Sequence, residues 1–166
     1  VVAVAALAWL LAPRGLPARW LGVAGLLPLF VVAPSALRAG DVEVVVLDVG
    51  HGVAALVRTA QHALLYDTGP AFGPGADSGN RIIVPFLRAT AVKRLEGMVV
   101  SHDDADHSGG APSVLQAVPV VWLLTSLPEL DPLLLQADQA FRCHAGQRWE
   151  WDEVKFEVLH PSRESY

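Results

Sequence analysis

The sequence feature that most constrains this chain is the segment SHDDADHSGG at 101–110, in which acidic and imidazole side chains crowd together. Two histidines and three aspartates lie within 102–107, directly after an apolar run at 98–101 that predicts a buried strand. Carboxylates this close repel one another, and desolvating them together is costly unless a cation neutralises them. Imidazole nitrogens and carboxylate oxygens are ordinary ligands of Zn²⁺, Mn²⁺ and Fe. We therefore predict a metal site here, against the simpler alternative of a solvated acidic loop.

The chain divides into an apolar segment, 1–40, and a more polar domain, 41–166. Residues 1–40 contain three arginines and no acid, so residues 41–166 hold the other 9 basic and all 17 acidic groups, a net charge of −8. Apolar residues make up 52% of the chain, and Cys143 is its one cysteine. This composition excludes a disordered protein and a cysteine-stapled secreted domain.

Residues 1–40 predict two transmembrane helices joined by a basic turn. The apolar run 1–12 would rise only about 18 Å as a helix, so we interpret it as the end of a longer span. A signal peptide is the competing interpretation. The run 20–37 approaches the length of a span, with a buried core helix as the alternative. Arg14 and Arg19 favour a cytoplasmic turn, which would place residues 41–166 outside the cytoplasm.

From residue 41 onward, short apolar runs broken by glycine predict a strand-rich domain. We expect strands at 42–49, 54–59, 63–66, 98–101 and 118–125, and a two-stranded hairpin within 147–159. Helical character is expected at 86–95 and 130–141, and an irregular glycine-rich loop at 69–80. Trp149 and Trp151 alternate on the hairpin, which favours one face of a core over base stacking.

The order of the motifs resembles a known family. His102-x-Asp104-x-Asp106-His107, followed by two glycines, is similar to the HxHxDH signature of the metallo-β-lactamase fold. Together with LDVGHG, LYDTGP and VPFLR earlier in the chain, it resembles the C-terminal domain of ComEC-type competence proteins, which are bacterial membrane proteins for DNA internalisation. The resemblance implies an α+β fold, the αββα sandwich of the metallo-β-lactamases. Residues 41–166 would form the N-terminal half of this sandwich, after transmembrane helices.

The resemblance also implies two divalent metal ions and a role for each residue of the cluster. His102 and Asp104 would hold one ion, and Asp106 and His107 the other. Asp104 stands where the general fold has its second histidine, and an oxygen donor there shifts the preference from Zn²⁺ towards harder ions such as Mn²⁺. Asp67 would orient a ligand imidazole or lie near the bound water, which makes it a candidate catalytic residue with Asp106. A plain turn residue is the alternative for Asp67.

Other residues are weaker candidates. Asp48 and His51 lie on one loop near the start of the domain, where His51 is expected either to touch substrate phosphate or to lie at the surface. His62 has no acidic context, so we expect it at the surface. His160 ends an expected strand, and it either approaches the metal ions or simply terminates that strand.

These features lead to one hypothesis of function and two alternatives. A pair of ions suits phosphodiester hydrolysis. The resemblance implies a nuclease that degrades the non-transported DNA strand during natural transformation, in a multi-pass protein of the bacterial cytoplasmic membrane. Single-stranded DNA, the membrane, the channel part of the same protein and other DNA-uptake proteins would be its partners. The alternatives are a metal-dependent hydrolase of a small ester or lactam, and a non-catalytic module that guides DNA.

Two further expectations concern residues 41–166 by themselves. Few cations are available for DNA phosphates, and we name Arg81, Arg88, Lys93 and Arg94 as the local candidates. Half of a sandwich would leave an apolar sheet face partly uncovered. We therefore expect the isolated chain to expose hydrophobic surface, to bind metal weakly and to lack activity.

Overall fold

The computed structural model describes residues 2–13, 17–27 and 36–165, and it divides the chain between Ala36 and Leu37 into two compact units. The first unit contains helix α1 (Val2–Leu11) packed against helix α2 (Leu21–Leu26). Small residues allow the close approach, because a Cβ on Gly22 would lie 2.5 Å from Leu10 Cγ. Helix α1 ends two residues before Pro13, since the residue before a proline disfavours helical backbone.

Both helices are shorter than the predicted spans. Within the part of the chain that the structure describes, no helix is long and apolar enough to cross a membrane. Residues 28–35, which belong to the second predicted span, lie outside the described residues.

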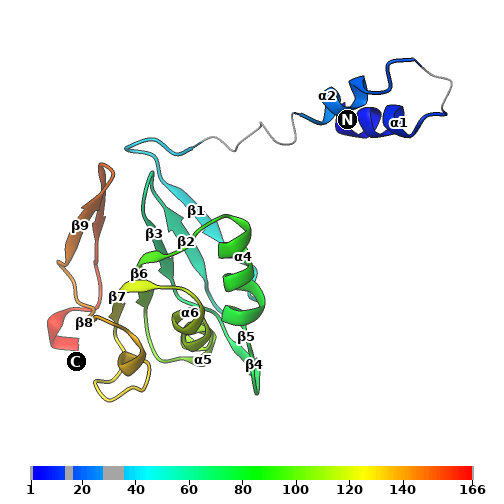
Figure 1. Cartoon of the computed structure of the whole chain (residues 1–166). Helices are drawn as coiled ribbons and strands as arrows, with labels where there is room; N and C mark the ends of the chain where they lie inside the picture. The colour runs from blue at the N-terminus through cyan, green and yellow to red at the C-terminus, as the bar shows by residue number, and fades with distance from the viewer. Residues whose placement is uncertain (1, 14–16, 28–35, 166) are drawn as a thin grey trace. The chain divides into compact units, whose positions relative to one another are not determined.

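The second unit is built on one six-stranded sheet of order β1-β2-β3-β6-β7-β8 (Figure 1). Its strands are β1 (Glu43–Val46), β2 (Ala55–Arg58), β3 (Ala63–Tyr66), β6 (Leu95–Val100), β7 (Val120–Thr125) and β8 (Ala140–Arg142). Strands β1, β2 and β3 are antiparallel neighbours, whereas β3, β6, β7 and β8 run parallel. The carboxyl ends of β3, β6 and β7 therefore meet at one edge of the sheet. With its short helices the unit is an α+β fold.

Helices cover one face of the sheet (Figure 1). They are the π-helical turn η1 (Gly79–Ile83), α4 (Val84–Ala89), α5 (Ala105–Ser108) and α6 (Ala111–Ala117). The core on this side includes Leu56, Leu65, Leu87 and Met98, each fully buried. The helix predicted at 86–95 is wrong at its C-terminal end, because the hydroxyl of Thr90 donates to a carbonyl of the last turn and the chain then enters β6.

An aromatic hairpin packs on the opposite face. Strands β9 (Arg148–Trp151) and β10 (Val154–Glu157) confirm the predicted hairpin, and Trp149 and Trp151 belong to a second apolar cluster, as expected. The rings of Trp149 and Phe156 stack with centroids 5.2 Å apart, and Trp122 of β7 meets Trp149 edge-on. Gly97 of β6 makes room for Trp122, since a Cβ there would lie 2.4 Å from the indole ring.

Part of this second face is uncovered, as the sequence predicted. Val44 and Val46 of β1 are 58% and 74% exposed. Their neighbour Val45 points the other way and packs against the helix-side core. The alternation of β1 therefore places an apolar face in solvent beyond the hairpin.

Two expectations about local structure are wrong. Residues 130–141 form the short 3₁₀ turn η2 (Leu134–Gln136) followed by β8, because Asp131 caps the amide of Leu133 and closes a turn instead of a helix. The glycine-rich stretch 69–80 contains a small hairpin of β4 (Ala71–Gly73) and β5 (Ala76–Asp77). Glycines with positive φ at its turn allow this reversal.

Candidate metal-binding site

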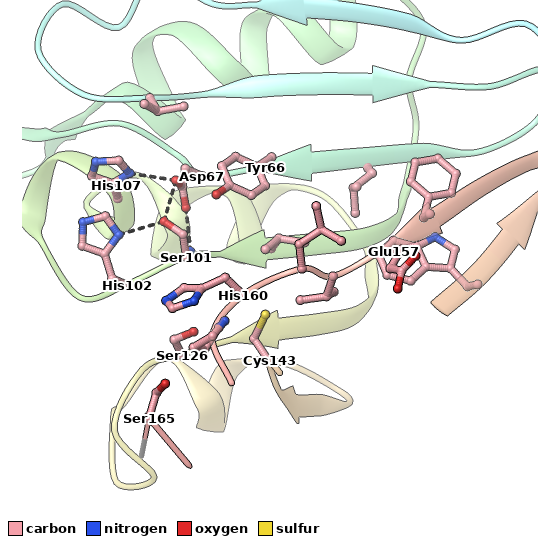
Figure 2. Close-up of a pocket in the computed structure, with 18 residues that line it drawn as sticks. Tyr66, Asp67, Ser101, His102, His107, Ser126, Cys143, Glu157, His160 and Ser165 are labelled. Atoms are coloured by element: carbon pink, nitrogen blue, oxygen red, sulfur yellow. Dashed lines mark hydrogen bonds and ion pairs between the residues drawn. The ribbon is translucent and has the colours of Figure 1, made fainter. Parts of the chain in front are cut away.

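Asp67 is the centre of the site, and the parallel pairing of β3 with β6 places it there. It follows β3 directly, whereas Ser101 and His102 follow β6. The Asp67 side chain is fully buried and accepts three hydrogen bonds, from the Ser101 amide at 2.7 Å, the Ser101 hydroxyl at 2.8 Å and His107 Nδ1 at 2.7 Å (Figure 2). Because an ionised carboxylate only accepts, His107 carries its proton on Nδ1 and keeps the lone pair of Nε2 available.

Backbone contacts hold the loop 101–108 against two other loops. The amide of Thr68 donates to the carbonyl of His107 at 2.8 Å, and the Thr68 hydroxyl donates to the same oxygen at 2.9 Å. On the other side, a Cβ on Gly52 would lie 2.0 Å from the carbonyl oxygen of Asp106. Gly52 also has a φ of +108°, so this close approach depends on glycine.

The imidazoles and carboxylates of the cluster are arranged in pairs. His102 Nε2 lies 3.3 Å from Asp104 Oδ2, and His107 Nε2 lies 3.7 Å from Asp106 Oδ2. His51 Nε2 lies 3.5 Å from the same Asp106 oxygen. The rings of His102 and His107 have centroids 4.0 Å apart. Both rings thus direct Nε2 towards a carboxylate, while Nδ1 contacts Asp67 in one case and the Ser101 hydroxyl in the other.

The imidazole nitrogens and carboxylate oxygens of this cluster are the types of donor that bind a divalent metal ion. Ligand imidazoles in proteins donate their second nitrogen to a carboxylate, carbonyl or hydroxyl, and Asp67 provides that arrangement for His107. The donors stand in pairs, however, and no three His, Cys, Asp or Glu side chains of the described ranges converge on one point. The assignment of His102, Asp104, Asp106 and His107 as ligands therefore stays a prediction.

Among the remaining acidic and imidazole side chains, Asp48 and Asp103 lie apart from the pairs, whereas His51 contacts Asp106. Asp48 is exposed, and its Oδ1 accepts the amide of Gly50 at 3.2 Å, so it shapes its own loop. His51 is highly exposed and reaches the cluster through Asp106. Asp103 is exposed, and its carboxylate has no partner within the part of the chain that the structure describes.

A cavity of about 910 Å³ opens beside the paired side chains, between the sheet and the hairpin. Asp67, Ser101, His102 and His107 lie at one end of it, and His160 lies between that end and Cys143 (Figure 2). The rest of the lining is largely apolar, and it includes Leu64, Val99, Trp149, Phe156 and Val158. His160 thus shares a cavity with the two imidazoles, which the sequence left open.

Sequence reasoning missed Tyr66 as a cavity residue. Its ring lies in the cavity beside Asp67 (Figure 2). Burial raises the pKa of its phenol, and the neighbouring Asp67 carboxylate raises it further. The phenol therefore stays neutral at ordinary pH and can donate a hydrogen bond. The signal was available, because Tyr66 is two residues after Leu64 on the same face of an expected strand.

His62 is not a plain surface residue, contrary to expectation. Its Nδ1 lies 3.0 Å from Asp152 Oδ2, and its ring stacks on Trp151 with centroids 5.1 Å apart. The same oxygen of Asp152 accepts the Thr59 hydroxyl at 2.6 Å and the Gln61 amide at 2.8 Å. The hydrogen bond from Thr59, followed by that from His62, lowers the pKa of Asp152 to about 2. This Asp152 junction ties the hairpin turn to the turn between β2 and β3.

Comparisons with known proteins find a matching family and several similar proteins. Residues 47–163 match the Metallo-beta-lactamase superfamily. The chain is 41% identical over 162 residues to "Competence protein ComA" of Neisseria gonorrhoeae, covering 98% of this chain and 22% of that protein. It is 36% identical over 121 residues to "Recombination protein 2" of Haemophilus influenzae, covering 72% of this chain and 14% of that protein. The chain thus spans about a fifth or less of these relatives.

Two other proteins are also similar to this chain. "Uncharacterized protein YcaI" of Escherichia coli is 34% identical over 124 residues, 75% of this chain and 15% of that protein. Among solved structures, a subclass B3 metallo-beta-lactamase from a soil metagenome library, MEM-A1, aligns with a TM-score of 0.47 at 16% identity. That alignment covers 70% of this chain and 47% of the other.

Proposed function

The chain belongs to the metallo-beta-lactamase superfamily, and on that premise we propose that its second unit is the metal-dependent nuclease site of a bacterial DNA-uptake protein. Superfamily membership suggests a hydrolase and implies a divalent metal ion, usually Zn²⁺. A relative named as a competence protein, similar over nearly the whole chain, supports a role in DNA uptake. The nuclease activity and the number and identity of the ions belong to the proposal.

One observation carries the proposal: the buried Asp67 carboxylate holds His107 so that its Nε2 lies near Asp106, beside the His102–Asp104 pair. His102 and Asp104 would hold one ion, and Asp106 and His107 the other, as Zn²⁺ or Mn²⁺. Bound ions of this kind activate a water and stabilise the charge that develops on a phosphodiester in hydrolysis. Asp67 maintains the tautomer and orientation of His107, and Ser101 does the same for His102.

The cavity supports a nucleotide as substrate. Its volume of about 910 Å³ lies near the upper end for ligand pockets, and apolar side chains line most of it away from the acidic end. A nucleobase could contact that apolar wall, formed in part by Trp149 and Phe156, while its phosphate lies near His102 and His107. Such a base must be unstacked, which favours single-stranded DNA.

We also propose that the first unit lies in the bacterial cytoplasmic membrane, with the second unit outside the cytoplasm. Large apolar side chains of α1 and α2 point outward, among them Val4, Leu11 and Val23, whereas the interface between the helices contains Ala6 and Gly22. Small residues at a helix interface with apolar residues outside are typical of membrane helices. The channel part of the same protein and other DNA-uptake proteins would be its partners.

The proposal is tested with the full-length protein that contains this chain and with two classes of substrate. A labelled single-stranded 30-mer, a chromogenic ester and a chromogenic lactam are each incubated with Zn²⁺, with Mn²⁺ or with EDTA. We expect metal-dependent cleavage of the DNA that falls at least 100-fold in Asp106→Asn. The matched control is Asp103→Asn, an exposed aspartate of the same loop, which should cleave like the unmodified chain.

Two other outcomes would each contradict the proposed nuclease activity. Cleavage of the ester or lactam alone would assign a small-molecule hydrolase. DNA binding without metal uptake, unchanged by His107→Ala, would assign a module that guides DNA. Circular dichroism of each variant shows whether its fold is intact before its activity is compared.

A further inference from the structure

A second polar cleft lies at the other end of the strands that carry the candidate metal site. This basic cleft has a volume of about 510 Å³ and is lined by the turn 58–63, between β2 and β3, and by the segment 90–96, between α4 and β6. Strands β3 and β6 begin in its lining, whereas Asp67 and His102 follow their far ends. At about 3.3 Å per residue, six-residue β6 separates the two places by about 20 Å.

Three cations of this acidic domain gather at the cleft. Although residues 41–166 carry a net charge of −8, Arg58, Lys93 and Arg94 line this one cleft. Its acid, Glu96, is already occupied, because one carboxylate oxygen binds Arg94 and the other accepts the amide of Ala63 at 3.0 Å. Arg94 is thus paired with Glu96, as Arg58 is with Glu43, and Lys93 is the cation of the lining that has no acidic partner among the residues that the structure describes.

These cations keep free donors. Arg58 uses Nη1 towards Glu43 at 3.2 Å, and Arg94 uses Nε towards Glu96, so each guanidinium retains further N–H groups. Lys93 is exposed and has no hydrogen-bond or ion-pair partner among the residues that the structure describes. A lysine without an acidic partner, between two arginines that are only partly engaged, is suited to a polyanion.

We propose that the basic cleft binds phosphates of a DNA strand whose neighbouring stretch occupies the candidate metal site. This inference rests on the proposed nuclease function and adds a second place of contact to it. Phosphates of duplex DNA are 3.4 Å apart along each strand, and those of an unstacked single strand lie farther apart, so fewer than about six phosphates span the 20 Å between the two places. Polar side chains such as Thr59, Gln61 and Thr90 complete the lining, and it lacks the exposed large apolar side chains that anchor proteins on lipid.

The test measures binding without cleavage. The full 166-residue chain is titrated into 5′-fluorescein-labelled (dT)20 in EDTA, and fluorescence anisotropy gives the Kd between 25 and 200 mM NaCl. Lys93→Ala should weaken binding several-fold and lower the slope of log K against log salt by about 0.7, as expected for one lost single-strand phosphate contact. Lys93→Glu should weaken binding further. The matched control is Lys155→Ala, the other lysine of the sequence, exposed on β10.

Equal slopes for the unmodified chain and Lys93→Ala would overturn the proposal. Anionic phosphatidylglycerol vesicles form a second arm, and binding to them that depends on Lys93, with no change for (dT)20, would assign the cleft to lipid headgroups instead. In the full-length protein with metal present, Lys93→Ala should raise KM for (dT)20 and leave hydrolysis of a small chromogenic phosphodiester unchanged. A full-length protein that binds DNA through Lys93 but cleaves nothing would refute the nuclease and retain the cleft, whereas cleavage that does not depend on Lys93 would refute the cleft alone.

Discussion

Replacing Asp67 by alanine should cost the second unit much of its stability. The buried carboxylate accepts the Ser101 amide and His107 Nδ1–H at 2.7 Å each, and both donors would lose their partner. An orphaned buried donor costs about 1–3 kcal/mol, so the free energy of unfolding should fall by about 2–6 kcal/mol. The Ser101 hydroxyl adds little to this loss, because Ser101 is only half-buried and lines the cavity, where its O–H can donate to water.

Asp67→Asn should separate stability from metal binding. The amide oxygen of the asparagine can still accept the hydrogen bond from the Ser101 amide. Asp67→Asn should therefore be considerably more stable than Asp67→Ala. The NH₂ group of the asparagine can only donate to His107 Nδ1, which moves the imidazole proton to Nε2 and removes the lone pair that a metal needs. Metal affinity should fall by about 10–100-fold in both Asp67→Ala and Asp67→Asn. This is the usual loss when the carboxylate that hydrogen-bonds a metal-binding histidine is removed.

Urea unfolding followed by tryptophan fluorescence, and titration with Zn²⁺ or Mn²⁺, measure the two effects. Asp103→Ala is the matched control, since a surface substitution should change stability by no more than about 0.5 kcal/mol. The reasoning is refuted by an Asp67→Ala variant that loses less than about 1 kcal/mol. An Asp67→Asn variant that keeps its full metal affinity refutes the proposed role of the tautomer.

Two further predictions concern the packing of the hairpin. The pKa of Asp152 is lowered to about 2 from an ordinary 3.8, so its carboxylate stabilises the fold fully above about pH 4, and this contribution is lost as the pH falls through 2. Asp152→Asn should remove that acid-dependent part of the urea midpoint between pH 5 and 2, and an unchanged pH slope would contradict the assignment. Gly97→Ala would bring a methyl group to 2.4 Å from the Trp122 ring and should destabilise the unit by about 1–3 kcal/mol. The near-ultraviolet circular dichroism spectrum, which reports on the packing of the indole, should change. An unchanged spectrum would show that the indole does not lie on β6.

The strands of this fold could be predicted where apolar runs end at turn residues. The run 63–66 coincides with β3, and the hairpin of β9 and β10 lies within the predicted 147–159. The placement of the acid–imidazole cluster after a buried strand was also correct. These features depend on local alternation and on short turns, both of which can be read from consecutive residues.

Partners far apart in the sequence could not be predicted from spacing. Asp67 meets His107 across 40 residues, and His62 meets Asp152 across 90, because strand order and register decide which ends meet. His62 was misassigned for that reason, since its acidic partner lies on another element. The resemblance indicated a role for Asp67, whereas the residues by themselves left it open as a turn residue.

The helix predicted at 130–141 failed for a different reason. Its leucines are numerous, but Leu130 and Leu135 are exposed, so they do not form one apolar stripe against the core. Asp131 then closes a local turn with its side chain. Counting apolar residues without testing their spacing overestimated the helix.

One side of the cavity is formed by the hairpin of β9 and β10, and the acid–imidazole pairs lie on loops from a different part of the chain. The turn of this hairpin is fastened at the Asp152 junction, at one end, whereas the chemical groups follow β3 and β6. Sequence changes along β9 and β10 can therefore reshape what the cavity admits without moving the groups that would perform hydrolysis.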